Sequence, residues 1–227
     1  TFRRKKDAEE LSCGFEEIQK YAFRKYKIKT IENKHTHLVP EELERLENLI
    51  LSDRYVKLQK SLDAFLFCCY AGMRYSDFIN LSSENIVDIN QETWLIYKSV
   101  KTGTEVRLPL YLLFSGKGIT ILNKYKDNLE DFFHLRDNSN INKDLIIITR
   151  LAGLSKRISF HTARHTNATL LIYNGINITT VQKLLGHKSV KTTQIYTNVM
   201  DMTIIHDLEK MKQAIPIAGK KVDNSFK

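Results

Sequence analysis

Two side chains of types that bind phosphate lie three residues apart, at His161 and Arg164. If this segment begins a helix, both fall on one face beside the helix N-terminus, where backbone N–H groups and the helix dipole favour an anion. A guanidinium also presents a planar fork of donors that matches two phosphate oxygens. The pair by itself is weak evidence, because such residues at a helix start often serve as caps or surface groups.

A further pair of candidates lies downstream, where His187 directly follows Gly186 and Tyr196 comes nine residues later. A tyrosine hydroxyl can attack phosphorus as a nucleophile when a base removes its proton. The residues alone leave a second interpretation open, in which two short helices around Gly186 form a helix-turn-helix and Tyr196 is one more packed aromatic residue. The ten tyrosines of the chain favour that second interpretation by composition.

Two more residues complete a set: Arg74, which follows a Gly-Met pair, and Lys101, which precedes a Thr-Gly pair. In sequence order the set reads Arg74, Lys101, His161, Arg164, His187 and Tyr196. This order resembles the catalytic residues of the tyrosine recombinase or phage integrase family, of the mobile-element type. The resemblance covers about residues 38–213, and Asp77 stands where the family usually has an acidic residue. It implies a mainly α fold with a small antiparallel β-sheet.

The resemblance also implies how a DNA strand would be cut and rejoined, in DNA integration or excision. Tyr196 would attack the scissile phosphate and form a 3′-phosphotyrosyl bond, leaving a free 5′-hydroxyl. His161 would be the general base for the phenol, whose ordinary pKa is about 10. Lys101 would donate a proton to the departing 5′-oxygen.

The remaining three residues of the set would bind the phosphate itself. Arg74 and Arg164 would hold the two non-bridging oxygens, whose charge grows in the transition state. His187 would hydrogen-bond one of these oxygens. No metal or other cofactor is implied, and the residues agree, since a two-metal nuclease needs clustered carboxylates and residues 145–200 contain no Asp or Glu.

Charge in this part of the chain is one-sided. Residues 145–200 carry seven Lys or Arg side chains and three histidines, and the whole chain has a net charge of +9. Such a stretch is suited to face a polyanion, because Lys and Arg near phosphates supply much of the affinity for nucleic acid. We expect double-stranded DNA as the partner. The side chains expected to touch its phosphates are Arg150, Lys156, Arg157, Lys188 and Lys191.

Patterns of apolar residues predict the elements that position these groups. Helices are expected to begin at Pro40 and to span about 56–70, 119–133, 162–174, 179–185 and 190–198. Residues 141–152 fit either a strand or a helix, and we choose the helix. Short β-prone runs at 86–89, 94–100 and 105–110 predict an antiparallel meander, with Lys101 at a turn.

Three regions are expected: residues 1–37, the end of a preceding core-binding region with a linker; 38–213, the catalytic domain; and 214–227, a tail. Residues 15–26 have the apolar spacing of an amphipathic helix. A second presumed helix, about 202–214, has an apolar stripe. The resemblance implies a tetramer on DNA that exchanges a C-terminal segment between protomers.

Cysteine usage and hydropathy bound the environment of the chain. Its three cysteines provide neither a disulfide framework nor zinc-ligand spacing, which fits a reducing cytoplasm. No apolar run approaches the roughly 18 residues that a membrane span needs. Two other functions stay open at this stage: a type IB topoisomerase with a closely similar residue set, and a DNA-binding regulator without catalytic activity.

Overall fold

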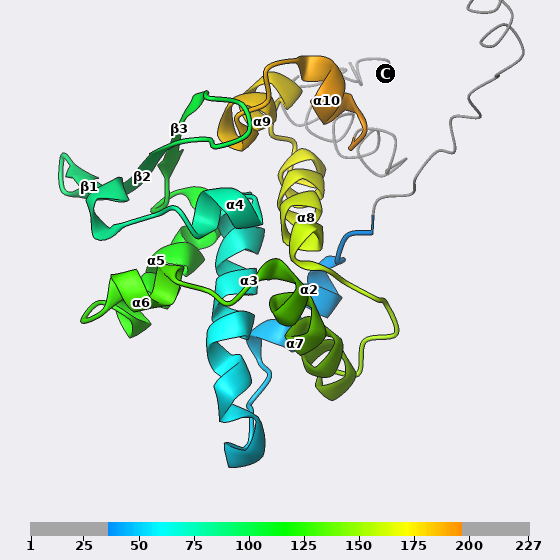
Figure 1. The fold of residues 1–227 in the computed structure, drawn as a ribbon. Coiled ribbons are helices and arrows are strands. Elements are labelled where there is room, and N and C mark those ends of the chain that lie inside the picture. Colours follow the sequence, from blue (N-terminus) through cyan, green and yellow to red (C-terminus); the bar gives the residue numbers. More distant parts are fainter. Residues whose placement is uncertain (1–35, 197–227) are drawn as a thin grey trace, which may run out of the picture. The chain divides into compact units, whose positions relative to one another are not determined.

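A computed structural model describes residues 36–196 of the chain, which are mainly helical with one small sheet (Figure 1). This confirms the predicted fold class. The α-helices are α2 (Pro40–Glu47), α3 (Gln59–Ala71), α4 (Tyr75–Phe78), α5 (Lys117–Lys124), α6 (Leu129–Phe133), α7 (Asn138–Leu151), α8 (Phe160–Tyr173), α9 (Ile178–Leu185) and α10 (Val190–Gln194). The strands are β1 (Ile86–Ile89), β2 (Glu92–Lys98) and β3 (Glu105–Pro109). Short 3-10 helices span Asp53–Leu58, Ser83–Asn85 and Leu113–Gly116.

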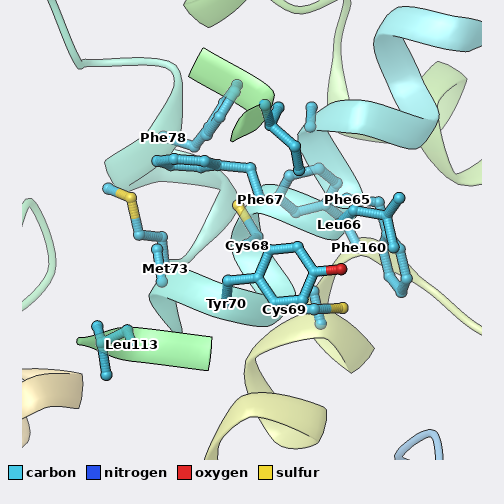
Figure 2. Packing of buried hydrophobic residues seen from close by; sticks show 14 of the residues in the cluster. Phe65, Leu66, Phe67, Cys68, Cys69, Tyr70, Met73, Phe78, Leu113 and Phe160 are labelled. Atoms are coloured by element: carbon cyan, nitrogen blue, oxygen red, sulfur yellow. The ribbon is translucent and has the colours of Figure 1, made fainter. Parts of the chain in front are cut away.

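Helix α3 is the centre of the core, because it is buried on every side from Ser61 to Ala71. A helix surrounded in this way needs apolar residues all round, and α3 supplies them from Leu62 to Ala71 except at Asp63, which binds Lys124 and Tyr125. Figure 2 shows its aromatic residues packing with Phe78 of α4. The rings of Phe67 and Phe78 meet edge to face at 5.9 Å between centroids. Such pairs stabilise the core beyond the area that they bury.

The two adjacent cysteines of α3 belong to the core. Cys68 and Cys69 are both fully buried free thiols on α3, and Figure 2 shows them among the aromatic side chains. Burial raises the pKa of each thiol well above its ordinary value. Both sulfurs therefore stay protonated and act as packing groups.

The junction between α3 and α4 requires glycine. Gly72 ends α3 with a φ of +67°, in the left-handed region that a side chain disfavours. A Cβ at this position would lie 2.6 Å from Oδ1 of Asn167 on α8. The Asn167 amide also donates hydrogen bonds to the carbonyls of Cys69 and Tyr70, each at 2.9 Å. The end of α3 is thus fixed against α8 two residues before Arg74.

The sheet has the order β1-β2-β3 with both pairs antiparallel, which confirms the predicted meander. Leu95 and Tyr97 of β2 pair with Leu108 and Val106 of β3, and all four side chains are buried. This period of two directs one face of the sheet toward the core. The β2–β3 connection then projects Lys101 from the end of the sheet, and α9 packs against β3.

Three expected helices differ in the structure, and one of them, expected over 190–198, is shorter because α10 ends at Gln194. Residues 119–133 do not form one helix, because α5 ends at Lys124 and α6 begins at Leu129. Asn128 causes the break: its side chain accepts a hydrogen bond from the N–H of Asp131 and caps a new helix. The helix expected over 56–70 begins later, at Gln59, after a 3-10 turn. By contrast, the helix chosen for 141–152 is confirmed as α7.

Several expectations lie outside the described residues. These are the helix at 15–26, the helix at 202–214 and the tail from 214 onward. The limits of the three regions stay predictions for the same reason. None of the helices within residues 36–196 is both long enough and apolar enough to cross a membrane.

Candidate active site

Arg164 is the most buried of the six candidate side chains, with 1 % of its surface exposed. From the second turn of α8, its guanidinium donates to the carbonyls of Gly72 at 2.7 Å and Leu185 at 2.6 Å. Gly72 is the C-cap residue of α3 and Leu185 is the last residue of α9, so Arg164 joins the ends of these two helices to α8. Burial and then Arg74 lower the pKa of Arg164 to about 10, and the group stays charged at neutral pH.

Arg74 lies at the N-cap of α4 and is held by two partners. One of its terminal nitrogens donates to the Ser99 hydroxyl at 3.2 Å and to the Asp77 carboxylate at 3.5 Å. Asp77 is almost completely buried. It also accepts the N–H of Val100 at 2.8 Å. A buried carboxylate thus connects Arg74 with the turn that carries Lys101.

Lys101 is exposed in the turn between β2 and β3, as predicted. The turn is closed by the Gly103 N–H, which donates to the Ser99 carbonyl at 2.8 Å. Gly103 has a φ of +67°, a conformation that glycine adopts at little cost. The Lys101 ammonium therefore projects from a backbone turn. Contacts of the residues beside Lys101 with Asp77 and Gly186 set the position of this turn relative to the helices.

His187 is buried directly after Gly186, which ends α9 with a φ of +63°. Its Nδ1 lies 2.9 Å from the Thr193 hydroxyl of α10. The pKa of His187 is lowered to about 4, first by burial and then, in decreasing order of effect, by the electrostatic influence of Arg164, Arg74, His161 and Lys101. The imidazole is therefore neutral at pH 7.

Tyr196 is 5 % exposed and follows α10. Burial raises the pKa of its hydroxyl, while Arg164 and Arg74 act in the opposite direction. Its ring centroid lies 5.5 Å from that of His165, whose ring is in turn 4.5 Å from His161. His165 thus packs between the predicted base and the predicted nucleophile.

The structure brings the six candidate residues into one neighbourhood. Four of them act electrostatically on His187, and Tyr196 is under the influence of both arginines. One detail differs from the simple helix-face prediction, because His161 is exposed whereas Arg164 is buried. Arg164 turns away from solvent since its two carbonyl partners lie inside the fold.

The five residues predicted to touch phosphate divide into two groups. Lys188 and Lys191 are both exposed and close in sequence to His187, with Lys188 just before α10 and Lys191 on it. Arg150 and Arg157 are exposed at the end of α7 and beyond it, and Figure 1 shows α7 well away from α9 and α10. Lys156 is half-buried and already has an anionic partner, because its ammonium binds the Glu42 carboxylate at 2.7 Å. These contacts remain predictions, and the geometry favours the first group.

Sequence reasoning missed the hydroxyl groups that hold the site together. Ser99 binds Arg74, Thr193 binds His187 and Thr102 binds the Gly186 carbonyl. Small polar residues are common in loops, and no spacing rule singles out these three. Within residues 36–196, no three His, Cys, Asp or Glu side chains form a group able to hold a metal ion.

Comparison with known proteins gives these residues a context. The phage integrase family model matches residues 37–202. A tyrosine recombinase of Pseudothermotoga lettingae is 29 % identical over 181 residues, which are 78 % of this chain and 60 % of that protein. The tyrosine recombinase XerA of Thermococcus onnurineus is 31 % identical over 162 residues, 68 % of this chain and 55 % of that one. The chain thus spans somewhat more than half the length of these relatives.

Solved structures agree at the level of the fold. A crystal structure of XerA recombinase superposes with a TM-score of 0.59 at 27 % identity, covering 80 % of this chain and 65 % of that chain. A lambda integrase dimer bound to a COC′ core site gives a TM-score of 0.54 at 22 % identity, over 71 % of this chain and 58 % of that chain. Because the family model covers most of the sequence, and the six residues stand together in a matching fold, the chain belongs to the phage integrase family.

Proposed function

We propose that this chain is the catalytic part of a tyrosine site-specific DNA recombinase, which cuts and rejoins DNA strands through a 3′-phosphotyrosyl intermediate. The observation that carries the proposal is the convergence on His187 of cationic side chains from α8, the start of α4 and the β2–β3 turn. The relatives described above are named tyrosine recombinases, which supports the same reaction class.

The covalent step begins at Tyr196. Its phenolic oxygen forms a bond to phosphorus while the bond from phosphorus to the 5′-oxygen breaks, and the leaving electron pair goes to that oxygen. Because burial raises the pKa of the phenol, a base has to take its proton. His161 accepts that proton in our proposal. His165, whose ring contacts both, holds the two groups in place.

The charge that builds on the non-bridging oxygens is met by donors fixed in advance. Arg164 donates one N–H to the Gly72 carbonyl and one to the Leu185 carbonyl. Because a guanidinium has five N–H groups, the others remain available to a phosphate. Arg74 is oriented by Ser99 and Asp77. If the Thr193 hydroxyl donates to Nδ1, the neutral His187 carries its proton on Nε2 and can donate it to the same oxygens.

Lys101 completes the reaction by giving a proton to the 5′-oxygen as it leaves. Reversal of these steps rejoins a strand, and the phosphotyrosyl bond conserves the energy of the broken phosphodiester, so the proposal needs no cofactor. We further propose double-stranded DNA as the partner and a tetramer on that DNA, in which protomers exchange a C-terminal segment. A mobile-element role stays a prediction.

The test is covalent capture. The 227-residue chain is incubated with a pool of nicked duplexes whose central sequence is randomised, and adducts are isolated under denaturing conditions. We expect a protein–DNA adduct whose attached strands share a sequence when they are read out. Absence of any adduct above the background of the Tyr196→Phe variant would overturn the proposal. A supercoil-relaxation assay on the selected sequence separates recombinase from topoisomerase activity.

A further inference from the structure

The turn that carries Lys101 is held from two sides, by the residues immediately before and after the lysine. On one side the Val100 N–H donates to Oδ1 of Asp77 at 2.8 Å. On the other side the Thr102 hydroxyl donates to the carbonyl of Gly186 at 3.2 Å. Lys101 itself points to solvent between these two contacts. The backbone at Lys101 therefore has one attachment to the α4 region and one to the end of α9.

Each attachment ends beside another residue of the active site. Asp77 pairs with Arg74, and Gly186 directly precedes His187. The Gly186 carbonyl is a fixed acceptor, because the Gly186 N–H donates to Lys183 at 3.0 Å. The residue also packs so closely on β3 that a Cβ would lie 2.6 Å from Val106. The Thr102 hydroxyl thus links the turn that carries Lys101 to the end of α9 that carries His187.

Such a contact matters because the other hydrogen bonds of the turn, among the described residues, stay within it or go to Arg74 and Asp77 and so do not tie it to α9. Val100 is 59 % exposed, and a lysine side chain has a long flexible stem. A proton donor has to come within hydrogen-bond distance of the leaving oxygen. A displacement of about 1 Å can cost on the order of 100-fold in rate. A turn free to swing away from α9 would place the ammonium too far from the phosphate.

We propose that Thr102 is a positioning residue for Lys101: its hydroxyl holds the β2–β3 turn on the Gly186 carbonyl and so sets the reach of the ammonium toward the 5′-oxygen. This inference rests on the proposed recombinase function. The hydroxyl is well oriented for the task, because it also accepts the Thr104 N–H at 3.4 Å within the turn. Thr102 itself touches neither phosphate nor nucleophile in this account.

The experiment compares Thr102→Val with a matched control, Thr104→Val. Both threonines are half-buried in the same turn, and the Thr104 side chain makes no hydrogen bond to the described residues. Cleavage rates are measured on the selected nicked duplex and on the same duplex with a 5′-bridging sulfur. A thiolate leaves without needing a proton, so the sulfur substrate does not depend on Lys101.

We expect Thr102→Val to slow cleavage of the oxygen substrate about tenfold or more, with DNA affinity unchanged. On the sulfur substrate its rate should stay within about twofold of wild type. Thr104→Val should match wild type on both substrates, and Thr102→Ser, which keeps the hydroxyl, should restore the oxygen rate. All variants should melt within about 4 °C of wild type, since one hydrogen bond contributes about 1 kcal/mol.

Three results would overturn the inference. The first is cleavage of the oxygen substrate by Thr102→Val at the wild-type rate. The second is equal slowing on the oxygen and sulfur substrates, which would assign the hydroxyl a role unconnected with proton donation. The third is failure of Thr102→Ser to restore the rate, with normal melting. If wild-type protein forms no adduct at all, the proposed function fails and the inference fails with it. The first three results leave the proposed function intact.

Discussion

At the scale of single residues, Tyr196 is the group whose loss separates chemistry from binding. Tyr196→Phe should abolish the covalent adduct and leave DNA affinity nearly unchanged, because the lost hydroxyl is the proposed nucleophile and makes no large binding contact in that mechanism. Gel-shift and adduct assays on the same duplex measure both properties. Tyr173→Phe is the matched control, and it should form the adduct normally. An adduct formed by Tyr196→Phe would mean that another residue attacks the phosphate.

Lys101 has a prediction that depends on the leaving group. Lys101→Ala should slow cleavage of an ordinary phosphodiester by roughly 100-fold or more, within the range that general acid catalysis supplies. It should cleave a 5′-bridging phosphorothiolate at close to the wild-type rate. Lys98→Ala, which alters an exposed lysine on β2, is the control for charge. Equal slowing of Lys101→Ala on both substrates would reduce Lys101 to an electrostatic contact.

The low pKa of His187 predicts how stability depends on pH. The ordinary histidine pKa is 6.5, and the folded state lowers it to about 4. Between these values the unfolded chain binds more protons, so stability falls as the pH drops from about 6.5 toward 4. His187→Asn removes this titration. Between pH 7 and pH 4.5 wild type should lose about 2 kcal/mol more stability than the variant.

Thermal melts of both proteins at the two pH values test this prediction. A parallel decline of the two melting temperatures would show that His187 takes up its proton equally well in the folded state. His161→Asn serves as the comparison, because His161 is an exposed histidine of the same site. Its substitution should not reproduce the difference.

Residue types and order were enough to predict the six candidates, but not their supports. Thr102 and Gly186 are 84 positions apart in the sequence, and Ser99 and Arg74 are 25 apart. Contacts of this length depend on the packing of whole helices, which no local pattern encodes. The burial of Arg164 was missed for the same reason, since its two partners are backbone carbonyls and leave no signature in the sequence.

At the scale of elements, the end of α9 is a point where only glycine fits. Gly186→Ala should lower stability by about 1–2 kcal/mol for its positive φ. It should lose about 1–3 kcal/mol more from overpacking against Val106. Gly103 has a similar φ of +67°, but a Cβ there would meet nothing within 4 Å, so Gly103→Ala should show only the first cost. Chemical denaturation of the two variants measures the difference, and equal losses would contradict the close approach of α9 to β3.

Helix ends explain where element prediction succeeded and where it did not. The ends expected for the helices at 56–70 and 179–185 lie within one residue of the observed ends, where Gly72 and Gly186 stop α3 and α9 in the left-handed conformation. The break between α5 and α6 was missed because apolar spacing continues across it, while the Asn128 cap that causes it is a single polar residue. The choice of a helix for α7 was correct despite its β-branched residues, since its period of 3.6 outweighs local propensity.

At the scale of the whole molecule, assembly is the property that the C-terminal region is expected to control. Deletion of residues 202–227 should leave a folded domain that binds DNA and loses strand exchange, if that segment serves a neighbouring protomer. A melting curve and a recombination assay on the truncated protein test this. A drop in melting temperature much greater than about 8 °C would assign the segment to its own domain's core and end the exchange hypothesis.

The order of the candidate residues along the chain is also the order in which they are synthesised. Arg74 precedes Tyr196 by more than half of the sequence, and Tyr196 packs on a histidine that is itself made late. A ribosome adds roughly 5–20 residues per second, so Tyr196 follows Arg74 out of it by on the order of ten seconds. In the proposed mechanism Tyr196 is the nucleophile, so during that interval the nascent chain holds the phosphate-binding arginines without the group that attacks the phosphate. Cleavage of DNA would then have to wait until synthesis has passed Tyr196.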